Sequence, residues 1–277
     1  MAFEFNPNTI WISHSSLADF EKCPWLYYLR NLYRDAKFGN NFRIQVANPY
    51  LSLGEIVHDA IDNFVNRYQP RERSKDKMMY ELSRGWVLKK GKTGGFKTQS
   101  QEEEFKDRSV QMAQRFLANE DFAGKIPLKT PGFPKKKLFT DKDLVLVGNF
   151  DWLEDFEDGL HIVDFKTGQH EEAEDSLQLP IYSILANETL NKPVRKTSYW
   201  YLDKDPQPRV VQLKDLDESL GLIEQKALAV EKAKVEDNFP HRSENCIFCR
   251  EYELVSKGEA EHVGTDFKRR REVFFIR

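Results

Sequence analysis

Residues 144–168, LVLVGNFDWLEDFEDGLHIVDFKTG, indicate the fold of this chain. Two runs rich in Val, Leu, Ile, Phe and Trp flank the pair Asp158-Gly159. Asp-Gly between two such runs is a strong short-range signal for a β-hairpin with a tight turn. We therefore predict two antiparallel strands that are joined by a two-residue loop at Asp158 and Gly159.

This loop sets the register of the hairpin and thereby the placement of its charged residues. It places Leu153 opposite Asp164. Asp151 then lies opposite Lys166. Because side chains alternate between the two faces of a strand, Asp151, Asp164 and Lys166 are expected on one face. A solvated sheet face with cross-strand Asp/Lys pairs would show the same residues. However, residues 160–163 are almost entirely apolar, which indicates a buried strand, and charges at the end of a buried strand indicate a site.

Two further motifs flank the hairpin in the sequence. Residues 53–68 have apolar residues at helical spacing, and this predicted helix carries Gly54 and His58 in a Gly-x-x-x-His pattern. After the hairpin, a second predicted helix carries Gln178 and Tyr182, which lie four residues apart and so share one face. Taken singly, each of these residues is also typical of an ordinary amphipathic helix.

Taken in order, Gly-x-x-x-His, an aspartate, Asp-Phe-Lys-Thr-Gly and Gln-x-x-x-Tyr resemble the RecB-like branch of the PD-(D/E)xK nuclease superfamily. The resemblance runs from Ile12 to about Tyr252, which is nearly the whole chain. It implies an α/β (α+β) fold with a restriction-endonuclease-like core, in which helices flank a mixed central sheet. It also implies that residues 1–277 form a single domain, within which residues 66–140 are a helical insertion.

The resemblance implies a metal site with four ligands, which are His58, Asp151, Asp164 and the carbonyl of Phe165. Mg²⁺ suits the oxygen ligands, whereas Mn²⁺ tolerates the imidazole better. Lys166 is expected to orient the attacking water or to stabilise developing negative charge. Gln178 and Tyr182 are expected to position the phosphate or to support Lys166. The expected catalytic residues are thus Asp151, Asp164, Lys166, Gln178 and Tyr182.

The cysteines form a further part of the resemblance. CRISPR-adaptation and AddB-type relatives hold an iron–sulfur cluster with four cysteines, and three of these places are occupied here by Cys23, Cys246 and Cys249. Val255 stands near the fourth place, so an iron–sulfur cluster is not expected from this chain. Small buried thiols explain the three cysteines, and a zinc site completed by His241 or His262 is the alternative.

Composition limits the partners and the compartment of the protein. The chain has 277 residues with 42 Lys and Arg and 45 Asp and Glu, so its formal net charge is −3 and any basic binding surface must be local. The candidates for such a surface are the basic runs at 89–92, 135–137 and 269–271. Residues 1–10 lack the features of a signal peptide, and no apolar run approaches the roughly 20 residues that span a bilayer. Together with an odd cysteine count, these features predict a cytoplasmic protein without membrane contact.

The motifs together predict a divalent-metal-dependent DNA nuclease, either an exonuclease or a single-strand/flap nuclease, that serves recombination, repair or mobile-element defence. Its expected partner is DNA, as a single strand or as duplex ends. The sequence has no Gly-x-x-x-x-Gly-Lys-Ser/Thr phosphate loop, so a helicase would be a separate chain. Three alternatives are an inactive module that binds nucleic acid, a nuclease-fold scaffold in a helicase complex, and a metalloenzyme that acts on another substrate.

Overall fold

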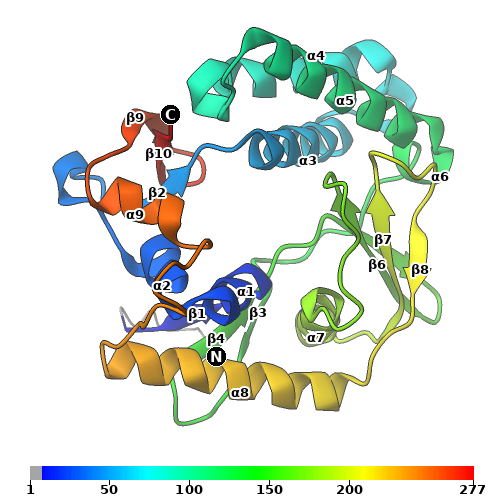
Figure 1. Cartoon of the computed structure of the whole chain (residues 1–277). Helices are drawn as coiled ribbons and strands as arrows, with labels where there is room; N and C mark the ends of the chain where they lie inside the picture. The colour runs from blue at the N-terminus through cyan, green and yellow to red at the C-terminus, as the bar shows by residue number, and fades with distance from the viewer. Residues whose placement is uncertain (1–7) are drawn as a thin grey trace.

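The structure of the chain is a computed structural model that describes residues 8–277 (Figure 1). Residues 1–7 lie outside the described residues. They make up most of residues 1–10, for which the sequence predicted no signal peptide. Within the described part of the chain, no helix combines the length and the apolar character needed to cross a membrane.

Helices and strands alternate along the chain, and their labels are those of Figure 1. The α-helices are α1 (His14–Lys22), α2 (Pro24–Tyr27), α3 (Pro49–Arg67), α4 (Lys75–Leu88), α5 (Gln99–Ala118), α6 (Glu120–Ala123), α7 (Gln178–Leu190), α8 (Leu216–Val235) and α9 (Arg250–Ser256). The strands are β1 (Ile10–Ile12), β2 (Arg43–Val46), β3 (Lys135–Lys137), β4 (Leu144–Val147), β5 (Trp152–Phe156), β6 (Gly159–Lys166), β7 (Val194–Tyr201), β8 (Arg209–Val211), β9 (Glu261–Asp266) and β10 (Arg271–Phe275). The helices predicted around His58 and Gln178 correspond to α3 and α7.

The central sheet has the strand order β5-β6-β7-β8 and mixes both strand orientations. β6 pairs antiparallel with β5 and parallel with β7, so β6 and β7 need a crossover connection, which contains α7. α7 packs on one face of the sheet, where Leu179 belongs to the same apolar cluster as Ile162 and Tyr199. The opposite face packs on α5 through aromatic contacts of Phe116 with Trp152. The expected α/β class, with a mixed sheet and flanking helices, is confirmed.

The hairpin of β5 and β6 forms as predicted, but its loop is one residue earlier than expected. Phe156 pairs with Gly159, so the two-residue loop consists of Glu157 and Asp158. Gly159 begins β6 because this strand passes very close to the segment before β7. A Cβ atom at Gly159 would lie 2.6 Å from the carbonyl oxygen of Pro193. Gly159 is therefore needed for the close approach of these two segments, and it does not lie inside the turn.

The different loop changes which residues are neighbours across the hairpin. Leu153 pairs with Ile162 rather than with Asp164. Continued by one residue beyond β5, the same pairing brings Asp151 level with Asp164 instead of Lys166. The register differs from the prediction by two residues, so each side chain keeps the face that the alternation gave it. The predicted neighbours were wrong, whereas the predicted face was right.

The first apolar run of this region forms two strands rather than the single strand that we predicted. β4 is separated from β5 by residues 148–151 and joins a different sheet with the order β1-β4-β3. The break coincides with a close approach to α7 at Gly148. A Cβ atom at Gly148 would lie 2.9 Å from Leu185 Cδ1 and 3.0 Å from Tyr182 Cε1. Asp151 consequently lies just before β5, outside the regular strand pairing.

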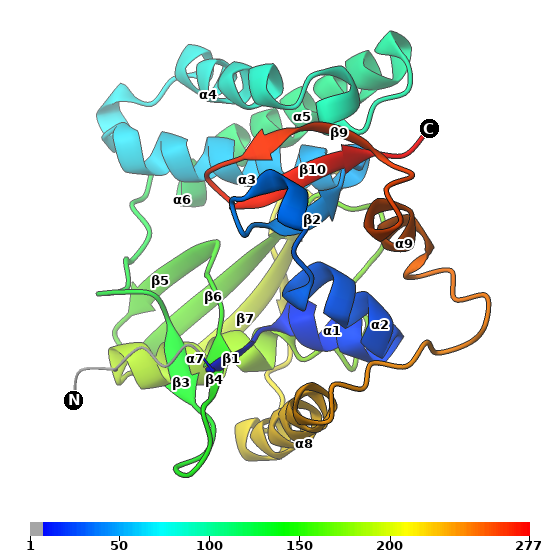
Figure 2. The same ribbon diagram turned by 90° about the vertical axis from the view of Figure 1, so that its left-hand side faces the viewer.

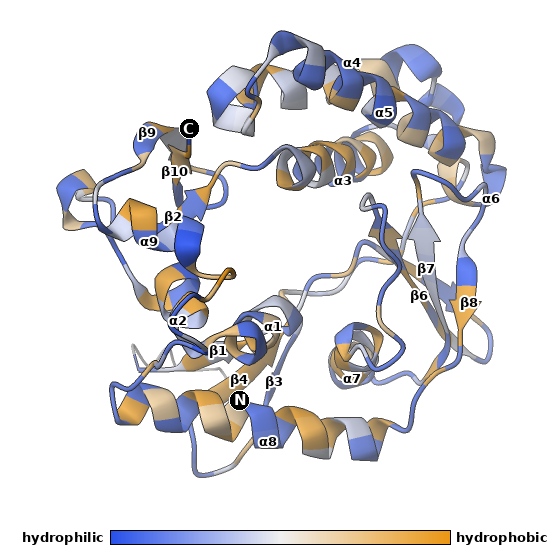
Figure 3. Cartoon of the chain, in the orientation of Figure 1, coloured by the Kyte–Doolittle hydropathy of each residue, from blue (hydrophilic) through white to orange (hydrophobic). Residues whose placement is uncertain are grey.

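Helices α4, α5 and α6 lie within residues 66–140, and α4 and α5 cover α3 on the side away from α7 (Figure 1). Their buried side chains, such as Met78 and Met112, share one apolar cluster with Phe64 of α3 and Trp200 of β7. Many residues of α4 and α5 are hydrophilic, whereas α3 is more hydrophobic (Figure 3). α3 lies between these two helices and the rest of the chain. The boundaries of a helical insertion, and the assignment of the whole chain to one domain, stay predictions.

A third sheet forms near the C-terminus and has the order β2-β10-β9. β10 pairs parallel with β2 and antiparallel with β9, which makes β9 and β10 a hairpin. Figure 2 shows this hairpin lying beside α3. Its turn contains Phe267 and Lys268, which line a cavity together with Glu55 and Asp59 of α3. The end of the chain therefore returns to the helix that carries His58.

Candidate active site

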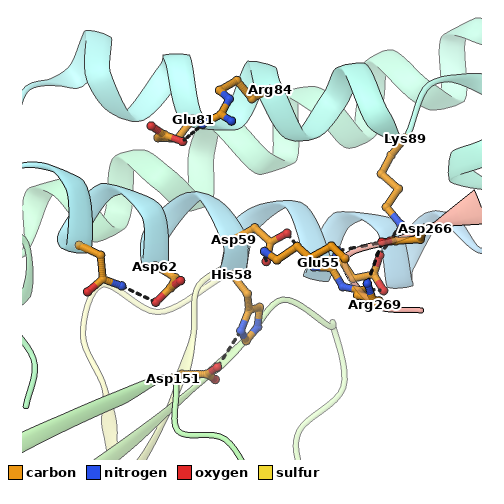
Figure 4. Close-up of polar contacts among 12 residues, drawn as sticks. Glu55, His58, Asp59, Asp62, Glu81, Arg84, Lys89, Asp151, Asp266 and Arg269 are labelled. Atoms are coloured by element: carbon orange, nitrogen blue, oxygen red, sulfur yellow. Dashed lines mark hydrogen bonds and ion pairs between the residues drawn. The ribbon is translucent and has the colours of Figure 1, made fainter. Parts of the chain in front are cut away.

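His58 and Asp151 form the first half of the candidate site (Figure 4). His58 Nδ1 lies 2.9 Å from Asp151 Oδ1, and the other carboxylate oxygen, Oδ2, accepts a hydrogen bond of 2.9 Å from the Phe165 backbone N–H. α3 comes near the end of β6 because it carries Gly54, where a Cβ atom would lie 3.1 Å from Thr167 Oγ1. The Asp151 carboxylate is thus held between a helix and the central strand.

Asp164 and Lys166 form the second half of the site at the end of β6. Lys166 Nζ lies 3.0 Å from Asp164 Oδ2. Gln178 of α7 bridges the two residues, since its Nε2 donates to Asp164 Oδ1 at 2.9 Å and its Oε1 accepts from Lys166 Nζ at 2.5 Å. Tyr182, one turn further along α7, lies with its hydroxyl oxygen 3.3 Å from Gln178 Nε2. The residues of the predicted Gln-x-x-x-Tyr motif therefore face the hairpin as expected.

The electrostatics of the site reflect burial and mutual repulsion of its carboxylates. Burial, followed by the nearby Asp151 carboxylate, raises the pKa of Asp164 to about 7. Burial disfavours the charged form of His58, but the hydrogen-bonded Asp151 carboxylate outweighs that effect and raises the pKa of His58 to about 9. Without a bound cation, the imidazolium of His58 is thus the positive charge that balances Asp151.

The donor atoms of the site fit a divalent cation. Asp164 Oδ2 is buried and lies 3.0 Å from the Lys166 ammonium. A buried carboxylate with a raised pKa gains from further positive charge beside it, which a divalent cation would supply. The side chains of His58 and Asp151 keep 32% and 19% of their exposure, so a cation can reach them. Two carboxylates and one imidazole are donors that Mg²⁺ or Mn²⁺ can use.

A cavity of about 350 Å³ opens beside this donor set. Its lining includes His58, Asp151 and Phe165, together with Lys268 and Arg269 of the β9–β10 turn. Asp59 and Asp62 also line it, and Asp59 pairs with both Lys268 and Arg269. Cationic side chains beside a site for a divalent cation suit an anionic substrate.

Comparisons with known proteins agree with this geometry. The sequence model of the PD-(D/E)XK nuclease superfamily matches residues 11–252. The chain belongs to the PD-(D/E)XK nuclease superfamily. The segment Asp164-Phe165-Lys166 has the form of the (D/E)XK part of that name. Members of this superfamily generally use divalent metals, which agrees with the donor set described above.

A solved structure supports the same fold. The chain is similar to the crystal structure, at 2.19 Å resolution, of a candidate exonuclease from Eubacterium rectale. The two share 12% sequence identity with a TM-score of 0.54, over 90% of this chain and 94% of that one. At this identity the likeness concerns the fold alone, and it confirms the expected restriction-endonuclease-like core. A search among curated proteins gave no match.

The structure adds contacts of Lys166 that the sequence motifs of the superfamily did not indicate. Lys166 Nζ lies 3.3 Å from Glu172 Oε2, and it stands over the ring of Tyr199 at 4.9 Å from the centroid. Glu172 belongs to an acidic loop whose composition alone gave no reason to place it at the site. Three acceptor side chains, including Asp164 and Gln178, therefore surround one ammonium group. Burial lowers the pKa of Lys166, but the Asp164 and Glu172 carboxylates outweigh burial, so the pKa is raised.

The basic turn at the site was also missed as a part of this nuclease-like centre. Of the basic runs noted in the sequence, the run at 269–271 reaches the cavity through Arg269. Arg269 is held by α3, with its guanidinium 2.7 Å from Asp59 Oδ2 and 3.4 Å from Glu55 Oε1 (Figure 4). By contrast, Lys89 is buried between Glu55 and Asp266. A basic run alone could not show which of these outcomes applied.

The three cysteines come together in a separate apolar cluster that also contains Leu26 and Leu29. Their sulfur atoms lie within 4.8 Å of one another. Of the two histidines considered beside them, His241 is the neighbour, with its Nδ1 3.5 Å from Cys249 Sγ. His262 lies elsewhere, because it pairs with Glu272 at 2.8 Å in the C-terminal sheet.

Proposed function

We propose that this PD-(D/E)XK chain is a divalent-metal-dependent DNA nuclease of the RecB-like branch. Its proposed activity is that of an exonuclease or a single-strand/flap nuclease in recombination, repair or mobile-element defence. The observation that supports it most is the convergence of one imidazole, two carboxylates and one ammonium group from distant segments, namely His58, Asp151, Asp164 and Lys166. Phosphodiester hydrolysis needs these groups together, because metal ligands and a positioned cation have to act on one phosphate.

His58, Asp151 and Asp164 are the proposed ligands of Mg²⁺ or Mn²⁺, with the Phe165 carbonyl as the fourth. When bound, such a cation lowers the pKa of a water molecule and polarises a phosphoryl oxygen. The ionised form of Asp164 is required for this role, and a positive charge in the site would favour it. The hydrogen bond from the Phe165 N–H keeps the Asp151 carboxylate directed toward the cavity.

Lys166 is the proposed electrostatic group of the reaction. Its ammonium can orient the attacking water or stabilise negative charge as it develops on the phosphate. Gln178 restricts the position of Lys166 through its amide oxygen and that of Asp164 through its amide nitrogen. Tyr182 in turn holds the Gln178 amide. Gln178 and Tyr182 thus act as positioning residues in this proposal.

The proposed substrate is DNA, which brings a phosphate backbone to the cavity wall formed by Lys268 and Arg269. The complete set of Asp151, Asp164 and Lys166 disfavours an inactive binding module or scaffold. A helicase partner on a separate chain and a cytoplasmic location stay predictions.

The decisive experiment is cleavage of end-labelled single-stranded and duplex DNA with Mg²⁺, Mn²⁺ or EDTA. We expect cleavage with a metal and none with EDTA. Asp164→Ala should abolish it, whereas Lys166→Ala should lower the rate by on the order of 10² or more while DNA still binds. Asp155→Ala is the matched control, because Asp155 lies on the neighbouring strand and pairs with Lys192 away from the site.

Each unwelcome outcome has a defined meaning. Wild-type protein that binds DNA but leaves it intact with both metals would replace the nuclease proposal by the inactive module. Cleavage that persists in Asp164→Ala would show that another site or another protein cuts the DNA. Loss of activity in Asp155→Ala would indicate that folding rather than chemistry had been disturbed.

A further inference from the structure

The cysteine cluster joins two segments from opposite ends of the chain. Cys23 stands at the junction of α1 and α2, while Cys246 and Cys249 lie in the loop that leads into α9. Figure 2 shows this loop passing beside α1 and α2. All three side chains are buried, at 0%, 8% and 1% exposure, and none forms a disulfide.

The three thiols have weak partners in this apolar surrounding. Cys23 Sγ lies 4.0 Å from the Pro240 carbonyl oxygen, and Cys249 Sγ lies 3.6 Å from the Cys246 carbonyl oxygen. Fold and packing alone do not require three thiols to meet, because any small apolar residues could fill the same space. Three thiols that converge from distant segments are instead typical of a site that binds a soft or borderline cation.

The three sulfurs come close to the dimensions of a tetrahedral zinc site, and His241 adjoins them through Cys249 in a second group with Glu253. A zinc–sulfur bond of about 2.3 Å places two thiolate sulfurs about 3.8 Å apart, and a sulfur and an imidazole nitrogen about 3.6 Å apart. The sulfurs here lie within 4.8 Å of one another, and His241 Nδ1 lies 3.5 Å from Cys249 Sγ. Small movements of side chains would therefore suffice to bring three sulfurs to bonding distance of one ion.

We propose that Cys23, Cys246, Cys249 and His241 bind one structural Zn²⁺ ion. His241 contacts the ring of Trp25, two residues after Cys23 in the chain, with the ring centroids 5.4 Å apart. Its neighbour Glu253, 3.3 Å from His241 Nδ1, is the competing oxygen donor, and zinc sites built mainly of thiolates commonly take an imidazole as the remaining ligand.

A four-cysteine iron–sulfur cluster does not fit these residues. The chain has three cysteines, all of them in this cluster. Val255 is 2% exposed and packs with Ile44, Val46 and Phe274 in a different apolar cluster, so that position is part of the hydrophobic core. A mononuclear zinc ion needs four donors of the kind that this chain offers, whereas a four-iron cluster needs a fourth thiolate.

The consequence of such a site is a link between the first helices and the C-terminal segment. The ion would connect α1 and α2 to α9, the helix that packs beside β2. Because the four ligands come together only in the folded protein, the free energy of zinc binding would add to the stability of the fold. The proposed zinc site is independent of the proposed nuclease activity, since it uses none of the same residues.

The test is metal analysis of the full-length protein after purification without added metals and after reconstitution with Zn²⁺. We expect about one zinc and no stoichiometric iron per chain. In the native protein the three thiols should resist a thiol reagent, and they should react after a chelator has removed the ion. Iron in place of zinc would overturn the proposal. So would protein that takes up no stoichiometric zinc on reconstitution and whose thiols then react equally before and after treatment with the chelator.

Co²⁺ as a replacement for zinc identifies the fourth ligand. The wild-type protein should show the visible absorption of tetrahedral cobalt together with thiolate-to-cobalt charge transfer. His241→Ala should change the visible bands and weaken metal binding by about tenfold or more, while the charge-transfer band remains. His262→Ala is the matched control and should leave the spectrum unchanged. An unchanged spectrum in His241→Ala would refute the assignment of His241, even if zinc is present.

Discussion

His58 Nδ1 and Asp151 Oδ1 lie 2.9 Å apart although 93 positions separate the two residues in the sequence. This contact connects α3 to the beginning of β5 and leaves one edge of the imidazole at the cavity. A hydrogen bond between a histidine and a carboxylate fixes the orientation of the ring. In the proposed metal-bound state, the same pair would have to exchange a proton for a cation, which leads to the first prediction.

Metal binding should release a proton from His58. At a pH of about 8, which lies between the pKa of Asp164 near 7 and that of His58 near 9, His58 still holds its proton while Asp164 has lost most of its own. A ligating imidazole has to be neutral, so binding of Mn²⁺ displaces that proton. Titration calorimetry in two buffers of different ionisation enthalpy measures the number released. His58→Ala should release fewer protons and bind more weakly, and equal release in both proteins would contradict the prediction.

The stability of the protein without Mg²⁺ or Mn²⁺ should fall as the pH rises, because of Asp164. Burial and the Asp151 carboxylate raise the pKa of Asp164 from its ordinary value of 3.8 to about 7. The folded protein then holds a proton that the unfolded chain has released. This contribution to stability is complete below a pH of about 4 and is lost as the pH rises through about 7.

Asp164→Asn tests this relationship because asparagine does not titrate. The free energy of unfolding of the variant, minus that of the wild type, should increase between pH values of about 4 and 7. Urea unfolding at several pH values, without added divalent metals, gives this difference. Added Mg²⁺ should reduce it, since the cation favours the ionised carboxylate of the wild type. A difference that stays constant across the window would show that Asp164 titrates normally.

Gln178→Ala should slow cleavage by about 10- to 100-fold, because Lys166 and Asp164 lose the amide that fixes their relative positions. The KM for DNA should change little, since Gln178 is proposed to position these groups rather than to bind substrate. Gln178→Glu keeps an acceptor for Lys166 but places a second carboxylate beside Asp164, so it should shift the pH–rate profile to higher pH. Glu188→Ala, on an exposed part of α7, is the control. An equal rate loss in that control would indicate a general effect on the helix.

Lys268→Ala should weaken DNA binding without abolishing cleavage at saturating DNA. Lys268 is 64% exposed in the turn beside the cavity, where its Nζ lies 2.9 Å from Asp59 Oδ1. A lost phosphate contact lowers the salt dependence of binding by about one unit in the slope of log K against log salt. Fluorescence anisotropy at several salt concentrations measures that slope. Lys232→Ala on α8, at 74% exposure, is the control and should leave the slope unchanged.

Phe116→Ala should destabilise the protein by about 3–5 kcal/mol, as expected for removal of a fully buried aromatic side chain. Phe116 of α5 is 0% exposed and contacts Trp152, Phe165 and Trp200 of the central sheet. The helices of residues 66–140 therefore support the strand that carries the candidate site. Denaturant unfolding measures the loss, with Val87→Ala, at 77% exposure, as the control. A loss below about 1 kcal/mol would show that α5 contributes little to the sheet.

Much of the candidate site followed from local pattern. Alternation along β6 predicted that Asp164 and Lys166 share one face of the strand, and helical spacing predicted that Gln178 and Tyr182 share one face of a helix. These periodicities depend only on backbone geometry. They therefore held although the register of the hairpin differed from the prediction by two residues. The order of the motifs was sufficient to predict the superfamily, which the match over residues 11–252 confirms.

What the sequence determined by itself was therefore the hairpin, the helices and the face on which each charged residue lies. Only the tertiary structure decided that β4 and β5 are separate strands and that Glu172 lies beside Lys166. It also decided that Arg269, rather than Lys89, lines the cavity beside His58 and Asp151. It likewise decided that His241, and not His262, lies beside the cysteines. The physical reason is the same in each case. Periodicity is fixed by neighbours along the chain, whereas these contacts join segments whose approach depends on the packing of the whole core.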